Sequence, residues 1–233
     1  MNLALLIVML LRSAQLLLLG VGTGPTGINP VAVCTGTPGS GGGATSACNM
    51  SGATTLIICA ASDGGIASFT FADSSLNSYT SIPPNTVYAI SQCAYADSPT
   101  VSSSMTGSAL AVNSYPVVTF WGFSGTANPS YDSVHSACSN NFDAVTSFHP
   151  GPVTTVQNGS LLIAPIAFTN NGSTGFSISG GFTLDATFLY NPGVNYAGAS
   201  AHLIQATAGS TDPVYSWSGA NDGNGCLLTF KHP

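Results

Sequence analysis

The sequence predicts an all-β protein, an antiparallel β-sandwich, and two features of the chain support this. From about residue 28 onward, short runs rich in Val, Ile, Thr, Phe and Tyr alternate with clusters of Gly, Pro, Asn and Ser. Several runs also alternate at every second residue, as at Phe69/Phe71 and Phe176/Ile178, which is the period of a strand with one buried face. Many short strands at regular spacing are typical of sandwiches and barrels.

The predicted elements form one domain over residues 28–233. Residues 36–46 (GTPGSGGGATS) are expected to form a flexible loop, and Asp222-Gly223-Asn224-Gly225 a hairpin turn. Residues 199–207 contain few turn formers, so a helix is the alternative there, but the spacing of the neighbouring runs favours a strand. The expected strands are 30–35, 53–61, 66–72, 77–82, 86–96, 99–106, 115–123, 152–156, 160–168, 175–179, 181–189, 199–207, 212–218 and 225–231.

A separate segment, residues 1–27, precedes this domain and is strongly apolar over residues 2–19. A secretory signal has a basic start, an apolar centre and small residues before the cleavage site, whereas this segment has an uncharged start and Arg12 inside the apolar run. Arg12 also disfavours a membrane anchor. A signal peptide and a retained segment buried in an assembly therefore remain the two main alternatives.

The chain is almost uncharged: 4% of its residues are charged, against about 25% in ordinary soluble domains. With 44% apolar residues the chain should still fold, so its surface must consist of Ser, Thr, Asn, Gly and Ala. Such a surface has little charge repulsion to keep copies apart, which favours glycan cover or packing against neighbouring copies. Two basic residues are too few for nucleic acid or an anionic membrane.

Six cysteines in an apparently exported chain permit three disulfides. Cys34 and Cys48 flank the Gly-rich loop and are the expected pair. Cys59 lies in an apolar run and is equally well explained as a buried free thiol. No pair has the CxxC spacing of zinc ribbons or redox sites.

Three stretches resemble an uncharacterised type of domain found in bacterial, metagenomic and phage-derived proteins. They are SGATTLIICAAS with FADSSLNSYTSI (51–62 and 71–82), YPVVTFWGFSG (115–125), and NGSLLIAPIAF with the segments that follow it to LLTFKHP (158–233). Thr119 stands where the second motif has Ala. The resemblance covers about residues 50–233 and implies a jelly-roll sandwich similar to the concanavalin A-like lectin and glucanase fold. It carries no settled function, and fold similarity does not transfer activity.

No enzymatic motif is present, so we expect a protein that is not an enzyme. A glycosidase needs paired carboxylates, but the chain has no Glu and its Asp residues stand singly. A GxSxG elbow and HExxH are both absent. The pairs Asp132/His135 and Asp143/His149 are close in sequence but are interpreted as loop polarity.

The remaining candidate sites are for binding and modification. Asp73 and Asn77 are candidate calcium ligands, although a turn explains them better, and no other cofactor is expected. Tyr190 and Tyr196 flank a turn-like Asn-Pro-Gly and are candidates for stacking on a sugar. Three N-x-S/T sequons are candidate glycosylation sites: Asn49, Asn158 and Asn171.

The sequence thus favours a structural subunit of an extracellular assembly, such as a filament, a sheath or a virion appendage, on a cell or virion surface. Its expected partners are copies of itself. The apolar N-terminal segment is expected to complete a neighbouring subunit by strand addition. The alternative is a secreted carbohydrate-binding module or adhesin with glycans as partners.

Overall fold

The structure is a computed structural model that describes residues 27–63, 68–83, 89–111, 114–169, 172–190 and 196–233. The regular secondary structure in these ranges is entirely β-strand, which confirms the predicted all-β sandwich. Over the same ranges, no helix has the length and apolar character needed to cross a membrane.

The first sheet is antiparallel and has the strand order β4-β7-β2-β1-β8-β3-β6-β5. Its long strand β1 pairs with β8 as far as Thr35 and with β2 from Gly36 onward. The strands are β1 (Asn29–Gly39), β2 (Gly42–Thr45), β3 (Thr55–Asp63), β4 (Thr70–Asp73), β5 (Thr80–Ser81), β6 (Ala89–Asp97), β7 (Gly107–Leu110) and β8 (Val117–Ser124).

The second sheet is also antiparallel and has the order β12-β16-β11-β14-β13, with β9 pairing along β16. The last strand in the chain, β16, therefore lies inside the sheet between β9 and β11. The strands are β9 (Tyr131–Phe148), β11 (Ser160–Phe168), β12 (Thr174–Ile178), β13 (Thr183–Tyr190), β14 (Tyr196–Gln205) and β16 (Tyr215–Phe230); a separate short pair joins β10 (Val153–Thr154) to β15 (Ser210–Thr211).

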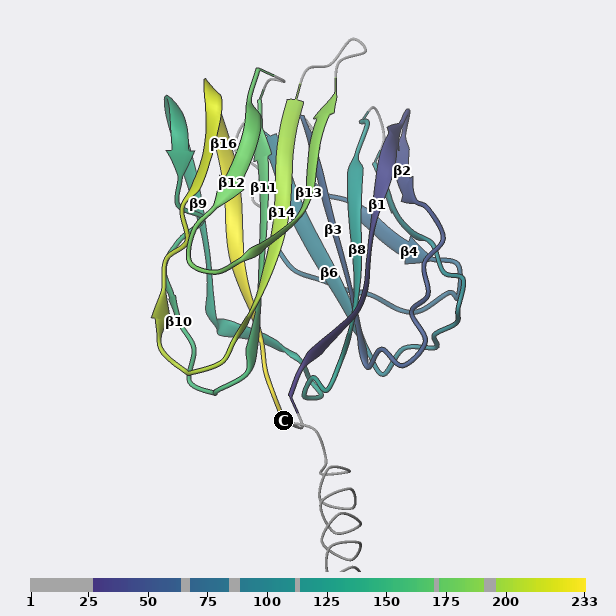
Figure 1. The fold of residues 1–233 in the computed structure, drawn as a ribbon. Coiled ribbons are helices and arrows are strands. Elements are labelled where there is room, and N and C mark those ends of the chain that lie inside the picture. The colour runs from purple at the N-terminus through teal and green to yellow at the C-terminus, as the bar shows by residue number, and fades with distance from the viewer. Residues whose placement is uncertain (1–26, 64–67, 84–88, 112–113, 170–171, 191–195) are drawn as a thin grey trace, which may run out of the picture.

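The two sheets face each other (Figure 1), and their central strands are buried on both faces. Phe120 of β8 packs in one core cluster while its neighbour Trp121 packs in another. Leu162 and Ile163 of β11 divide between two clusters in the same way. Because successive side chains of a strand point to opposite faces, both faces of these central strands are covered. This explains why β8 and β11 are continuous apolar runs rather than alternating ones.

Three disulfides cross-link the strands, and one is the predicted pair Cys34–Cys48. The second joins Cys59 of β3 to Cys93 of β6, which face each other in the register, so the free-thiol interpretation of Cys59 is wrong. The third joins Cys138 of β9 to Cys226 of β16 and closes a sequence separation of 88 residues.

The expected flexible loop at 36–46 is wrong, because most of it is the hairpin of β1 and β2. Most of its glycines are needed for close packing, and Gly41 takes the positive φ of the hairpin turn. A Cβ at Gly43 would collide with the carbonyl oxygen of Pro116, and one at Gly36 with the backbone of Ala44. The composition of this segment therefore reflects a strand with no room for side chains.

The expected hairpin turn at residues 222–225 is also wrong, because β16 continues through it. Here, too, glycine makes room for a neighbour: Cβ atoms at Gly223 and Gly225 would meet the side chains of Phe168 and Ile166. The predicted strand at 99–106 lies too early, since β7 spans Gly107–Leu110, and the polar strand β9 was not predicted. Residues 199–207 are mostly strand β14, as preferred.

Candidate functional site

In the described ranges, histidine–aspartate pairs are the groups best suited to general acid–base chemistry. Three of the four histidines in the sequence bind an aspartate through Nδ1: His202 with Asp185, His135 with Asp132, and His149 with Asp212. Asp143, which is close to His149 in sequence, is not its partner. An aspartate at Nδ1 orients a histidine for general-base catalysis, which also requires a nucleophile near the imidazole.

The buried pair lies between the two sheets. Asp185 sits at an irregularity in the register of β13 with β14, between Leu184 and Ala186. Its Oδ2 lies 2.8 Å from His202 Nδ1 and accepts a hydrogen bond of 2.9 Å from Trp121 Nε1. The side chains of His202 and Asp185 are only 12% and 4% exposed. One carboxylate thus ties β13 and β14 of one sheet to β8 of the other.

Neighbouring groups make this cluster rigid. The ring of Phe123 packs edge-on against His202, with centroids 5.7 Å apart. Burial, and secondarily the negative charge of Asp185, raises the pKa of Tyr215 well above its usual range. Tyr215 donates its hydroxyl hydrogen bond to the carbonyl oxygen of Ala164, so it too serves the packing of the sheet.

A nucleophile is missing beside His202 among the residues that the structure describes. The nearest serine along β14 is Ser200, but its hydroxyl is hydrogen-bonded to Thr119 Oγ1 at 2.9 Å. The hydrogen bonds of His202 all involve Nδ1 and Asp185. The arrangement therefore supplies an oriented imidazole without the hydroxyl that acyl transfer would require.

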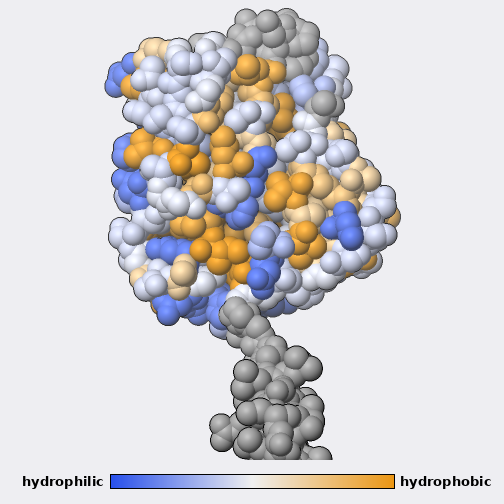
Figure 2. Space-filling model, in the orientation of Figure 1, coloured by the Kyte–Doolittle hydropathy of each residue, from blue (hydrophilic) through white to orange (hydrophobic). Residues whose placement is uncertain are grey.

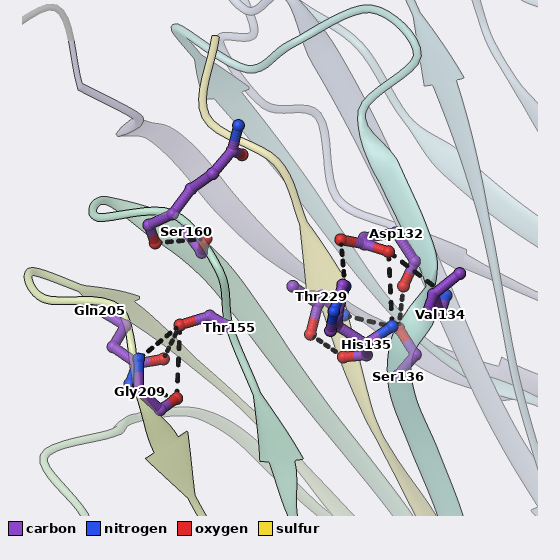
Figure 3. Close-up of polar contacts among 10 residues, drawn as sticks. Asp132, Val134, His135, Ser136, Thr155, Ser160, Gln205, Gly209 and Thr229 are labelled. Carbon is purple, nitrogen blue, oxygen red and sulfur yellow. Dashed lines mark hydrogen bonds and ion pairs between the residues drawn. The ribbon is translucent and has the colours of Figure 1, made fainter.

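The Asp132–His135 pair is followed by a serine, yet it forms an irregularity in the register of β9 with β16 and not a catalytic triad (Figure 3). Asp132 Oδ1 accepts the backbone N–H groups of Val134 and His135, and Oδ2 lies 2.8 Å from His135 Nδ1. Ser136 donates its hydroxyl to the Asp132 carbonyl oxygen and accepts the N–H of Thr229. These bonds fasten the start of β9 to β16.

Figure 3 also shows how polar side chains hold the end of the second sheet. Thr155 Oγ1 donates to Gln205 Oε1 at 3.1 Å and accepts the N–H of Gly209. Gln205 Nε2 donates to the Gly209 carbonyl oxygen. Because these bonds join the end of β14 to the neighbouring loops and the loops to each other, this cluster is also structural.

A groove lies where β1 parts from β8, opposite strand β13. Its volume is about 330 Å³, at the lower end of the range for ligand sites. Figure 2 shows apolar surface in the middle of the same face, in the area where β14, β13 and β8 lie in Figure 1. Its lining residues carry no charge: Thr35, Gly36, Pro38, Val117, Ala186, Thr187, Phe188 and Leu189.

The proposed calcium ligands form a turn. Asp73 Oδ2 accepts hydrogen bonds from Asn77 Nδ2 and from the Tyr79 hydroxyl, and Asp73 Oδ1 accepts the N–H of Ser75. Asn77 Oδ1 accepts the N–H of Thr100. The oxygens that would bind a cation face hydrogen-bond donors instead, so the geometry favours the turn over the metal site. In the described ranges no cluster of three His, Cys, Asp or Glu residues forms a metal site either.

Tyr196 is wrong as a sugar-stacking residue, because its side chain is fully buried. Its hydroxyl donates to the carbonyl oxygen of Tyr115, and its ring packs against Phe188. The Asn-Pro-Gly turn and the side chain of Tyr190 lie outside the described residues.

Two of the three predicted glycosylation sites lie among the described residues. Asn49 and Asn158 are exposed, as a glycan acceptor must be, although each side-chain oxygen also accepts a backbone N–H, from Ser51 and Ala208 respectively. Asn171 lies outside the described residues.

No protein-family model, curated protein or solved structure matches this chain. The resemblance to lectin-like jelly rolls is therefore neither supported nor contradicted, and function has to be argued from the structure itself. The groove and the Trp121–Asp185–His202 cluster were missed at the sequence level. Their members are far apart in the chain; the one local signal was a histidine inside the apolar strand β14.

Proposed function

We propose that the protein is a non-enzymatic structural subunit of an extracellular assembly, a filament, sheath or virion appendage, in which copies associate through nearly uncharged surfaces. The observation that carries this proposal is that most of the few charged side chains in the chain are engaged in internal hydrogen bonds. Most of its aspartates serve internal hydrogen bonds, so few carboxylates project freely from the surface.

The carboxylates illustrate this directly. Asp73 and Asp185 are buried and satisfied by neighbouring donors. Asp97 accepts from the Thr55 hydroxyl and the Ser130 N–H, and Asp222 accepts the N–H of Ala144. Asp132 and Asp212 pair with histidines. Lys231 is the single lysine or arginine in the described ranges. Little electrostatic repulsion is left to keep two copies apart.

Exposed apolar side chains add an attractive component to this neutral surface. Val134 is 83% exposed on β9, Val156 is 64% exposed, and Leu189 is 51% exposed on β13. Isolated apolar residues are common on protein surfaces. Here, however, the side chains between them are mostly neutral, which favours contact between copies over solvation.

Three disulfides among the described residues are compatible with an extracellular location, where such bonds persist. Among the described residues, no nucleophile is hydrogen-bonded to the imidazole of His202, which supports a role other than catalysis. The burial of Tyr196 removes one of the two residues on which a sugar-binding alternative rested.

Electron microscopy of native, unheated material, with intact-mass analysis of the same sample, tests the proposal. We expect ordered polymers or particles whose formation is nearly unchanged between 10 mM and 1 M salt, since a contact without charges is not screened (about 30 Å and 3 Å Debye lengths at these two limits). A monodisperse monomer at every concentration would overturn the proposal and would favour a secreted glycan-binding domain.

A further inference from the structure

The groove between β1 and β13 is bordered by an unprotected sheet edge. Strand β13 pairs with β14 on one side, and no described strand pairs with its other side. Natural proteins protect such edges with lysine, proline or bulges. The irregularity at Asp185 protects one end of β13, but the following residues, Ala186–Leu189, carry none of these devices.

The groove is suited to an apolar strand. Phe188, Leu189, Val117 and Pro38 contribute apolar side chains to its lining, and the only hydroxyls belong to Thr35 and Thr187. A sugar site would need carboxylate or amide groups to bind the hydroxyls, and this lining has none. An added strand gains backbone hydrogen bonds from a sheet edge and places alternate side chains in the adjoining pocket.

The sequence contains a segment with the matching character. Residues 2–19 are apolar except for Asn2, Arg12, Ser13 and Gln15, and a glycine-rich stretch, residues 20–27, connects them to the fold. Strand β1 starts at the end of the molecule where the C-terminus lies and runs to the opposite end (Figure 1). The groove borders the second half of β1, at Thr35, Gly36 and Pro38. The segment thus joins the fold far from its own groove, which favours the groove of a neighbour.

We propose that the β1/β13 groove receives residues 2–19 of a second copy as an added strand on the outer edge of β13. This inference rests on the proposed self-association and specifies its contact. Because the donor segment and the acceptor groove are different surfaces, the contact is heterologous and generates an open chain of subunits.

Two full-length variants test the contact separately. Leu189→Asp places a carboxylate in the groove, and Leu6→Asp/Ile7→Asp places one on each side of an extended donor segment, because adjacent residues of a strand face opposite ways. Each variant should raise the concentration needed for half-association about tenfold or more, measured by mass photometry. Leu110→Asp is the matched control, because Leu110 on β7 of the first sheet is as exposed as Leu189 (50% and 51%) and lies outside the groove; this variant should associate like the unmodified chain.

Mixing the two variants distinguishes exchange between copies from insertion within one copy. The groove variant retains a donor segment and the segment variant retains a groove, so a 1:1 mixture should form dimers that do not grow. A mixture that stays monomeric overturns the inference, as does a Leu189→Asp variant that associates like the control.

If Leu189→Asp still assembles, self-association stands and only the groove contact fails. If the unmodified chain keeps residues 2–19 and remains monomeric, both proposals fail. A peptide of residues 2–19 that is found cleaved from assembled material also refutes the contact. Equal unfolding midpoints for Leu189→Asp and Leu110→Asp establish that loss of association is not loss of folding.

Discussion

Replacing Asp185 with asparagine tests whether the buried carboxylate holds the two sheets together. Asp185 accepts hydrogen bonds from Trp121 and binds His202 Nδ1. An asparagine of the same size keeps one acceptor oxygen but turns an NH₂ group toward the second donor. An unmatched buried donor costs about 1–3 kcal/mol, and the bonds to a charged acceptor are stronger than those to a neutral one. The expected loss of unfolding free energy is about 2–4 kcal/mol.

Urea unfolding at pH 7, followed by tryptophan fluorescence and far-UV circular dichroism, measures this loss. The control is Asp212→Asn, which breaks the Asp212–His149 pair, because these side chains are 44% and 54% exposed and an exposed pair is worth only about 0–1 kcal/mol. The reasoning is refuted if Asp185→Asn costs no more than the control, which would mean that the sheets are held by apolar packing alone.

Four further results are expected. Replacing Cys138 and Cys226 together by alanine should cost about 4–5 kcal/mol in the same urea assay, more than removal of the bridge that closes a separation of 14 residues, because a longer loop gains more entropy on unfolding; equal losses would contradict this. Tyr196→Phe should cost about 1–2 kcal/mol by leaving the buried carbonyl without its donor, with no change on a glycan array. Addition of a chelator should leave the melting temperature unchanged, since the Asp73 oxygens are occupied by donors; a rise in the melting temperature on adding calcium would restore the metal site. Burial, followed by the hydrogen bond to Asp73, raises the pKa of Tyr79 far above its ordinary value of 10.0. The folded state therefore favours the neutral phenol. Its contribution to the free energy of unfolding is fully present below about pH 10 and falls as the pH rises above this value. Titration followed by absorbance at 295 nm should show one tyrosine that ionises only on unfolding, and this tyrosine should be missing in Tyr79→Phe.

The fold class was predictable because the strand signals of this chain are local. Runs such as those of β3, β8 and β11 are dense in apolar residues, and their bounds were predicted to within a few residues. The errors concern glycine and polarity. At Gly43 and Gly223, glycine marks a close approach of another element, which is a tertiary property that the local sequence does not reveal.

The candidate site was less predictable for the same reason. Trp121, Asp185 and His202 come from three strands and meet only when two sheets pack. Strand β9 is rich in Ser, Asn and Asp, so its propensity argues against a strand. It forms because β16 offers it a long partner and because Cys138 is linked to Cys226.

The internal position of β16 also bears on when the protein can fold. Residues 215–230 are synthesised after β9 and β11, yet both of these strands pair with them. Until those residues leave the ribosome, β11 has a long unpaired edge of nine apolar or small residues, a template for aggregation. The second sheet can therefore close only after residues 215–230 have been synthesised, and a chain truncated at about residue 213 would lack the strand that joins β9 to the rest of the sheet.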